Sequence, residues 1–135
     1  MLFSELTLGQ SAEFTKTVTE TDIVMYAGIT GDFNPMHVNE VYARASTFSG
    51  RIAHGMLTAG YISAVLGMKL PGEGSIYMSQ TLRFTKPVRI GDTITARIEV
   101  IELFPEKRRV RLATTCRNQN SELVLDGEAL VLMQK

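Results

Sequence analysis

Asp32 and His37 are the first pair of side chains in this sequence with the chemistry of an acid-base site. They lie five positions apart in residues 31–37, GDFNPMH, and the Asn-Pro step between them predicts a tight turn. A carboxylate and an imidazole that converge on one point can orient and deprotonate a water molecule. In the alternative interpretation, Asp32 caps the turn and His37 caps the next helix. Because turns of this type are common, the spacing alone favours capping.

His54 and Gly55 open a second segment of interest, at the start of an apolar helix. The unpaired N–H groups and the positive dipole end of a helix favour negative charge. The Gly55 amide can donate to a developing oxyanion, an interaction worth about 3 to 4 kcal/mol. Alternatively, Gly55 only relieves packing and His54 only bonds a nearby carbonyl. The sequence favours this second role for His54 and leaves both roles open for Gly55.

The composition excludes several classes of function. Fourteen Lys and Arg balance fourteen Asp and Glu, so the chain lacks the net charge that drives non-specific binding to nucleic acids or anionic membranes. The one cysteine, Cys116, cannot form an internal disulfide and suits a reducing compartment. We therefore expect a cytoplasmic protein with no metal site, no nucleic-acid partner and no membrane partner. The N-terminal residues carry no export signal.

The elements that must position these residues follow from periodicity. Residues 12–18 alternate as a half-buried strand, Thr19 to Asp22 predicts a capped helix start, and residues 39–45 predict a short helix. Residues 53–68 are small or apolar nearly all the way round, so we expect this helix to be surrounded by protein, with Ser63 in the core. A leucine at Ser63 would then overpack it.

The second half of the chain alternates with a period of two. Four segments (residues 76–84, 94–100, 110–116 and 123–131) are joined by short connections, which predicts an antiparallel meander. One apolar helix with one sheet face to cover suggests a sheet curled around that helix. With 135 residues and no linker or repeat, we expect a single domain over residues 1–135.

The segments 31–37 (GDFNPMH) and 52–57 (IAHGML) together closely resemble the MaoC-like (R)-specific enoyl-CoA hydratases of the hot-dog superfamily. The resemblance extends to residues 5–10, 70–77 and 84–92, and so covers essentially the whole chain. It implies an α+β hot-dog fold, in which an antiparallel sheet wraps around a long central helix. This arrangement agrees with the one that periodicity suggests.

The resemblance also implies roles for particular residues. Asp32 and His37 match the hydration dyad of the family, and the Gly55 amide matches its donor to the thioester carbonyl. Four further positions are implied to bind or orient substrate: Asn34, Ser63, Leu66 and Val131. The implied reaction is reversible syn addition of water to a trans-2-enoyl-CoA, giving an (R)-3-hydroxyacyl-CoA. Coenzyme A would be the substrate carrier, with no other cofactor, and the family habit implies a homodimer or a higher homo-oligomer.

Two other functions are compatible with the sequence. A hot-dog acyl-CoA thioesterase would share the fold, the acyl pocket and the carbonyl donor, and a non-catalytic acyl-binding module would need no meeting of Asp32 with His37. The hydratase interpretation is preferred because the segment with Asp32 and His37 belongs to the hydration branch.

Overall fold

The structure is a computed structural model that describes residues 1–135. In chain order, its elements are η1 (Phe3–Glu5), β1 (Ser11–Thr17), α1 (Glu20–Thr30), α2 (Pro35–Val38), α3 (Glu40–Arg44), α4 (Gly55–Met68), β2 (Ser75–Gln80), β3 (Arg83–Phe84), β4 (Thr93–Phe104), η2 (Pro105–Lys107), β5 (Arg109–Arg117) and β6 (Leu123–Met133). None of its helices combines the length and the apolar character needed to cross a bilayer.

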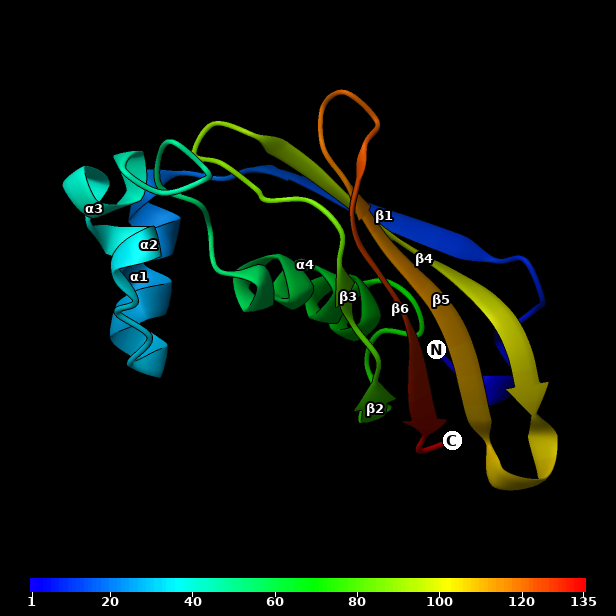
Figure 1. Cartoon of the computed structure of the whole chain (residues 1–135). Coiled ribbons are helices and arrows are strands. Elements are labelled where there is room, and N and C mark those ends of the chain that lie inside the picture. Colours follow the sequence, from blue (N-terminus) through cyan, green and yellow to red (C-terminus); the bar gives the residue numbers. More distant parts are fainter.

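The strands form one curved antiparallel sheet, with the order β1-β4-β5-β6-β2, and β3 also pairs with β6. Strand β4 alternates between partly and fully buried residues from Thr93 to Val100, as the period of two predicts for a sheet with one covered face. Helix α4 lies across the concave face, as Figure 1 shows. The predicted wrapping of a sheet around a helix is thereby confirmed.

The pairing of the fourth predicted strand differs from the expectation. Strands β4, β5 and β6 form the predicted meander, but residues 76–84 pair with β6 instead of β4. They are also divided into two strands, β2 and β3. The cause is the connection after β3, in which the Ala53 amide donates to the Val88 carbonyl and Ile52 bridges to Arg89. This connection carries the chain past the start of α4, so β4 begins beside β1.

Helix α4 packs one face into the core. Its buried residues are Thr58, Ala59, Tyr61, Ile62, Val65 and Leu66, and the apolar ones join a core cluster of 23 residues. The expectation that the helix is surrounded by protein is wrong for the opposite face, where Met56, Gly60 and Ser63 are exposed. A single sheet covers only one side of a helix, so the small residues on the other side remain open. Ser63 is therefore not a core residue.

Helices α1, α2 and α3 form a group that projects beyond the N-terminal end of α4 (Figure 1). The predicted start of α1 is confirmed, because Thr19 Oγ1 accepts from the Asp22 amide at 3.2 Å while Asp22 Oδ2 accepts from the Thr19 amide at 2.9 Å. The helix ends at Gly31, whose φ of 84° is in the left-handed region. This group brings residues 31–37 to the start of α4.

Candidate active site

Asp32 and Asn34 shape the turn between α1 and α2. The Asp32 carboxylate accepts a hydrogen bond from the Asn34 amide at 3.2 Å, and Asn34 Oδ1 accepts from the Met36 amide at 3.0 Å as the N-cap of α2. The predicted turn is present and Asp32 caps it, as expected. His37, however, lies within α2, and the N-cap of the following helix is Asn39. Asn34 thus holds the turn, and it does not line either cavity described below.

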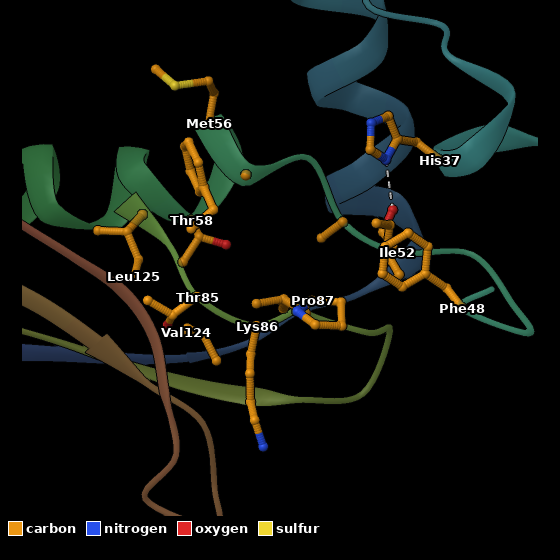
Figure 2. Close-up of a pocket in the computed structure, with 14 residues that line it drawn as sticks. His37, Phe48, Ile52, Met56, Thr58, Thr85, Lys86, Pro87, Val124 and Leu125 are labelled. Atoms are coloured by element: carbon orange, nitrogen blue, oxygen red, sulfur yellow. Dashed lines mark hydrogen bonds between the residues drawn. The ribbon is translucent and has the colours of Figure 1, made fainter. Parts of the chain in front are cut away.

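The His37 ring is fixed by a main-chain acceptor. Its Nδ1 lies 2.7 Å from the Ile52 carbonyl oxygen, and Figure 2 marks this hydrogen bond with a dashed line. Because a carbonyl oxygen only accepts, the Nδ1 atom carries the proton and Nε2 of the neutral ring presents a lone pair. Ligand atoms of Asp32, His37 and His54 all lie within 4.8 Å of one another. The carboxylate and the imidazole therefore converge, as general acid-base chemistry on one water molecule requires.

These three side chains are also the group in which a metal ion could find ligands. One ring nitrogen of each histidine is already engaged with a main-chain carbonyl, His37 with Ile52 and His54 with Asp32. The engagement of His54 is the bond to a nearby carbonyl that the sequence favoured. Each ring therefore keeps one unengaged nitrogen, and we interpret the cluster as an acid-base site because it brings the Asp32 carboxylate together with the His37 imidazole.

Gly55 is the first residue of α4 and faces a cavity of about 480 Å³. Its N–H donates to no acceptor within the chain, so it is available to a ligand. A Cβ atom at this position would lie 2.6 Å from the Phe84 ring. The packing interpretation of Gly55 is confirmed, because the glycine leaves room for Phe84. Its amide is a free donor, and its role toward a carbonyl stays a prediction.

This first cavity extends from His37 to apolar side chains near α4 and β6, and Asp32 does not line it. Figure 2 shows His37 and Phe48 on one side and Leu125 and Met56 on the other. Lys86 also lines this cavity and pairs with the carboxylate of the half-buried Glu122. Most of the wall is apolar, so the cavity suits an apolar chain with a polar group near His37 and Gly55.

A second cavity, of about 440 Å³, lies along the open face of α4. It shares Met56 with the first and is lined by Ser63, Tyr77 and Gln80, among others. The Tyr77 side chain is partly exposed, but partial burial of its hydroxyl raises the pKa to about 12, so this group stays neutral and donates to Gln80 Oε1. None of the residues that line the second cavity carries a charge.

Leu66 and Val131 lie beneath the second cavity. Both are almost fully buried, and neither lines either cavity. Leu66 follows Ser63 by three residues on α4, and Val131 is the cross-strand partner of Tyr77. Side chains at such positions are neighbours. Their implied role in substrate binding stays a prediction, to be exerted through the floor of the cavity.

The amino-acid sequence was compared with protein families and with known proteins, and it matches both. The family model described as "MaoC like domain" matches residues 4–122. The chain belongs to the MaoC-like domain family. It is 53% identical over 131 residues to an (R)-specific enoyl-CoA hydratase of Rhodospirillum rubrum, covering 97% of this chain and 90% of the relative. It is 52% identical over 135 residues to a 3-hydroxybutyryl-CoA dehydratase of Methylorubrum extorquens, covering 100% and 85%.

Solved structures of the MaoC-like family agree with the hot-dog fold. The unliganded R-hydratase PhaJ1 from Pseudomonas aeruginosa superposes with a TM-score of 0.94 at 46% sequence identity, covering 99% of this chain and 86% of that one. The family match includes Asp32, His37 and Gly55 but ends before Val131.

The contribution of residues 84–88 to this MaoC-like site was missed at the level of sequence. Phe84, Lys86 and Val88 all line the first cavity. Their spacing gave no signal, because they meet Gly55 only through the long-range contact of this connection with the start of α4. The stacking of His54 on His37 was also missed, because no local spacing indicates that these two rings meet.

Proposed function

We infer that this protein is an (R)-specific enoyl-CoA hydratase, a hydro-lyase that adds water reversibly to trans-2-enoyl-CoA. The observation that carries this conclusion is the convergence of Asp32 with His37, which lines one largely apolar cavity together with Gly55 and its free N–H. The similarity to relatives named as an (R)-specific enoyl-CoA hydratase and a 3-hydroxybutyryl-CoA dehydratase supports it.

In the proposed mechanism the thioester carbonyl oxygen accepts from the Gly55 N–H. A water molecule donates to the Asp32 carboxylate and to His37 Nε2, and as it attacks C3 one proton passes to this pair. The C2–C3 double bond becomes an enolate, whose negative charge gathers on the oxygen at the start of α4. The pair then returns one proton to C2, so the net change is the addition of one water molecule.

This mechanism predicts the stereochemistry of the product. A single dyad on one wall of the cavity delivers the hydroxyl to C3 and the proton to C2 from the same face, which gives a syn adduct. We expect hydration of crotonyl-CoA in deuterated water to yield the (R)-3-hydroxyacyl product with syn deuterium, measured by chiral chromatography and NMR. An (S) product would overturn the assignment as an (R)-hydratase. Anti addition would overturn the single-dyad mechanism.

The same substrate separates the competing functions. Loss of the absorbance of the conjugated double bond reports hydration, whereas release of free thiol reports thioester hydrolysis. We expect the first signal without the second. Free thiol as the main product would indicate a thioesterase, and binding of crotonyl-CoA without either signal would indicate a non-catalytic acyl-binding module.

The groups at the site complete the reaction without a further cofactor, so we propose coenzyme A as the carrier and no other cofactor.

We also propose that residues 1–135 act as one domain, supported by their shared core cluster. The free, buried thiol of Cys116 supports a cytoplasmic location, since such thiols persist in reducing compartments.

Finally, we propose that the protein works as a homodimer at least. The support is the outer strand β2, where Ile76, Tyr77 and Met78 are all exposed. The other outer strand, β1, instead carries Glu13 and Lys16, charges that discourage edge pairing. A second copy of the chain at β2 would cover the apolar side chains and extend the sheet.

A further inference from the structure

His54 connects the two halves of the candidate active site. It precedes Gly55 in the chain and is the N-cap residue of α4, but its side chain makes no capping bond. Instead, its Nε2–H donates to the Asp32 main-chain carbonyl at 2.9 Å. The ring is only 2% exposed, so water does not compete for this bond. One residue thus ties the turn that carries Asp32 to the residue that carries the free amide.

The same ring also contacts the second member of the dyad. The His54 and His37 rings stack with their centroids 3.9 Å apart and their planes tilted by 31°. Tyr26, on α1, packs against His54 with a centroid distance of 4.6 Å. His54 is therefore held by α1 and in turn limits where the His37 imidazole can lie.

The fold alone does not account for a histidine here. Its Nδ1 is buried and has no hydrogen-bond partner, which is unfavourable compared with an apolar ring of similar shape. Packing against Tyr26 and His37 would be served equally by phenylalanine. What phenylalanine lacks is the donor to the Asp32 carbonyl.

We propose that His54 is a positioning residue of the hydration site. It sets the placement of the Asp32 carboxylate and the His37 ring relative to the Gly55 N–H, through one hydrogen bond and one stacking contact. Water addition needs the attacking oxygen and the carbonyl donor at a defined separation, and small displacements of such groups are costly to rate. This inference rests on the proposed hydratase function.

The test uses steady-state hydration of crotonyl-CoA by the full chain. His54→Phe keeps the stacked ring and removes the donor, and we expect kcat to fall by about 10- to 100-fold while KM stays within about 3-fold. Gln places a side-chain N–H near the former Nε2 position, whereas Asn places it near Nδ1. We therefore expect His54→Gln to stay within about 5-fold of the wild-type kcat, and His54→Asn to behave like His54→Phe.

A double-mutant cycle separates positioning from a merely structural role. Added to Asp32→Asn, the His54→Phe change should cost less than about 3-fold in the residual rate, because the carboxylate whose main chain the His54 donor holds is already lost. Thermal unfolding of each variant accompanies the kinetics. If His54→Phe does not fold, the matched Gln and Asn variants carry the same comparison.

Three results would overturn the inference: a wild-type kcat in His54→Phe, equal rates in the Gln and Asn variants, or the same fold-loss from His54→Phe with and without the Asp32 carboxylate. A wild-type chain that does not hydrate crotonyl-CoA would overturn the proposed function as well. The two failures are distinguishable, because the wild-type rate is measured first.

Discussion

At the scale of single residues, main-chain carbonyls determine which ring nitrogen of each histidine carries the proton. The Ile52 carbonyl holds the proton of His37 on Nδ1, and the Asp32 carbonyl holds that of His54 on Nε2. Each bond leaves one ring nitrogen as a lone pair; that of His54 is buried without a partner, whereas the His37 residue lines a cavity. Two similar rings in contact therefore take different roles.

The first prediction concerns the dyad itself. Asp32→Asn and His37→Gln should each lower kcat by about 100- to 10,000-fold, because each removes a positioned acid-base group. Both residues lie in a partly exposed turn and short helix, so the unfolding temperature should change little. Asp126→Asn is the matched control, since this carboxylate on β6 lies outside both cavities. A variant with wild-type turnover would remove that residue from the mechanism.

At the scale of elements, α4 has two faces with different tasks. The face against β4 and β1 contributes to the core, while the open face with Gly60 and Ser63 forms a wall of the second cavity. Small residues on this open face leave room for a ligand without weakening the core. Acyl-chain length should therefore be sensitive to changes at Ser63, which lines the cavity, and at the buried Leu66, which follows it by three residues on α4.

The second prediction tests this division of α4. Ser63→Leu fills the cavity from an exposed position, so the free energy of unfolding should change by less than about 0.5 kcal/mol. Its kcat/KM should fall for longer enoyl-CoA substrates more than for crotonyl-CoA. Leu66→Ala should shift preference to longer chains but cost about 2 to 5 kcal/mol, because Leu66 is buried. Val131→Ala should shift the preference in the same direction.

The measurement compares kcat/KM over a series of chain lengths and denaturant unfolding for each variant. The hand of the product should stay (R) throughout, since the dyad is unchanged. A Ser63→Leu variant that is strongly destabilised, or that processes all chain lengths equally, would contradict the assignment of this face to the acyl chain.

A third prediction concerns the start of α1, which carries the dyad turn at its other end. Burial acts to raise the pKa of the Asp22 carboxyl, but hydrogen bonds from Lys16 and Thr19 outweigh it and hold the pKa below its ordinary 3.8. The ionised carboxylate therefore stabilises the fold fully above about pH 4, and this stabilisation is lost as pH falls through the lower value of the folded state.

Asp22→Ala should thus lower the free energy of unfolding by about 1 kcal/mol at pH 7, and the difference from wild type should shrink below pH ~4. Denaturant titrations at several pH values provide the measurement. Glu106→Ala, at an exposed carboxylate without an ion pair, is the control and should follow the wild type. A difference that stays constant down to pH ~2 would contradict the role of ionised Asp22.

At the scale of the whole molecule, the sheet ends in two unlike edges. Strand β1 is polar and charged on its exposed positions, whereas β2 exposes three adjacent apolar side chains. An exposed apolar edge strand favours association with another chain. The second cavity is lined partly by β2, so a partner at this edge would border the acyl site as well.

The fourth prediction follows from this asymmetry. Ile76→Lys should convert a dimeric protein into a monomer in analytical ultracentrifugation, because it places a charge in the middle of the β2 surface. Ile101→Lys is the matched control: Ile101 is 39% exposed against 42% for Ile76, but it lies on β4, which has a strand on each side. Dimers that persist in Ile76→Lys, or a monomeric wild type, would contradict the proposed assembly.

The sequence by itself determined the features that depend on neighbours along the chain. These are the capped start of α1, the turn around Asn34-Pro35, the apolar helix α4 and the meander of β4, β5 and β6. Capping, turn chemistry and periodicity depend on residues a few positions apart, so they can be recognised from the sequence alone. The convergence of Asp32 and His37 near Gly55 was foreseen through the resemblance, since spacing alone favoured capping.

Only the tertiary structure decided what depends on distant contacts. It paired β2 with β6, left Ser63 on an open face, brought Phe84 against Gly55 and placed His54 between Asp32 and His37. The physical reason is that a period or a motif describes which side of an element is apolar, but not what covers it. Which element covers an apolar face depends on packing between segments far apart in the chain, and a local pattern contains no information about such contacts.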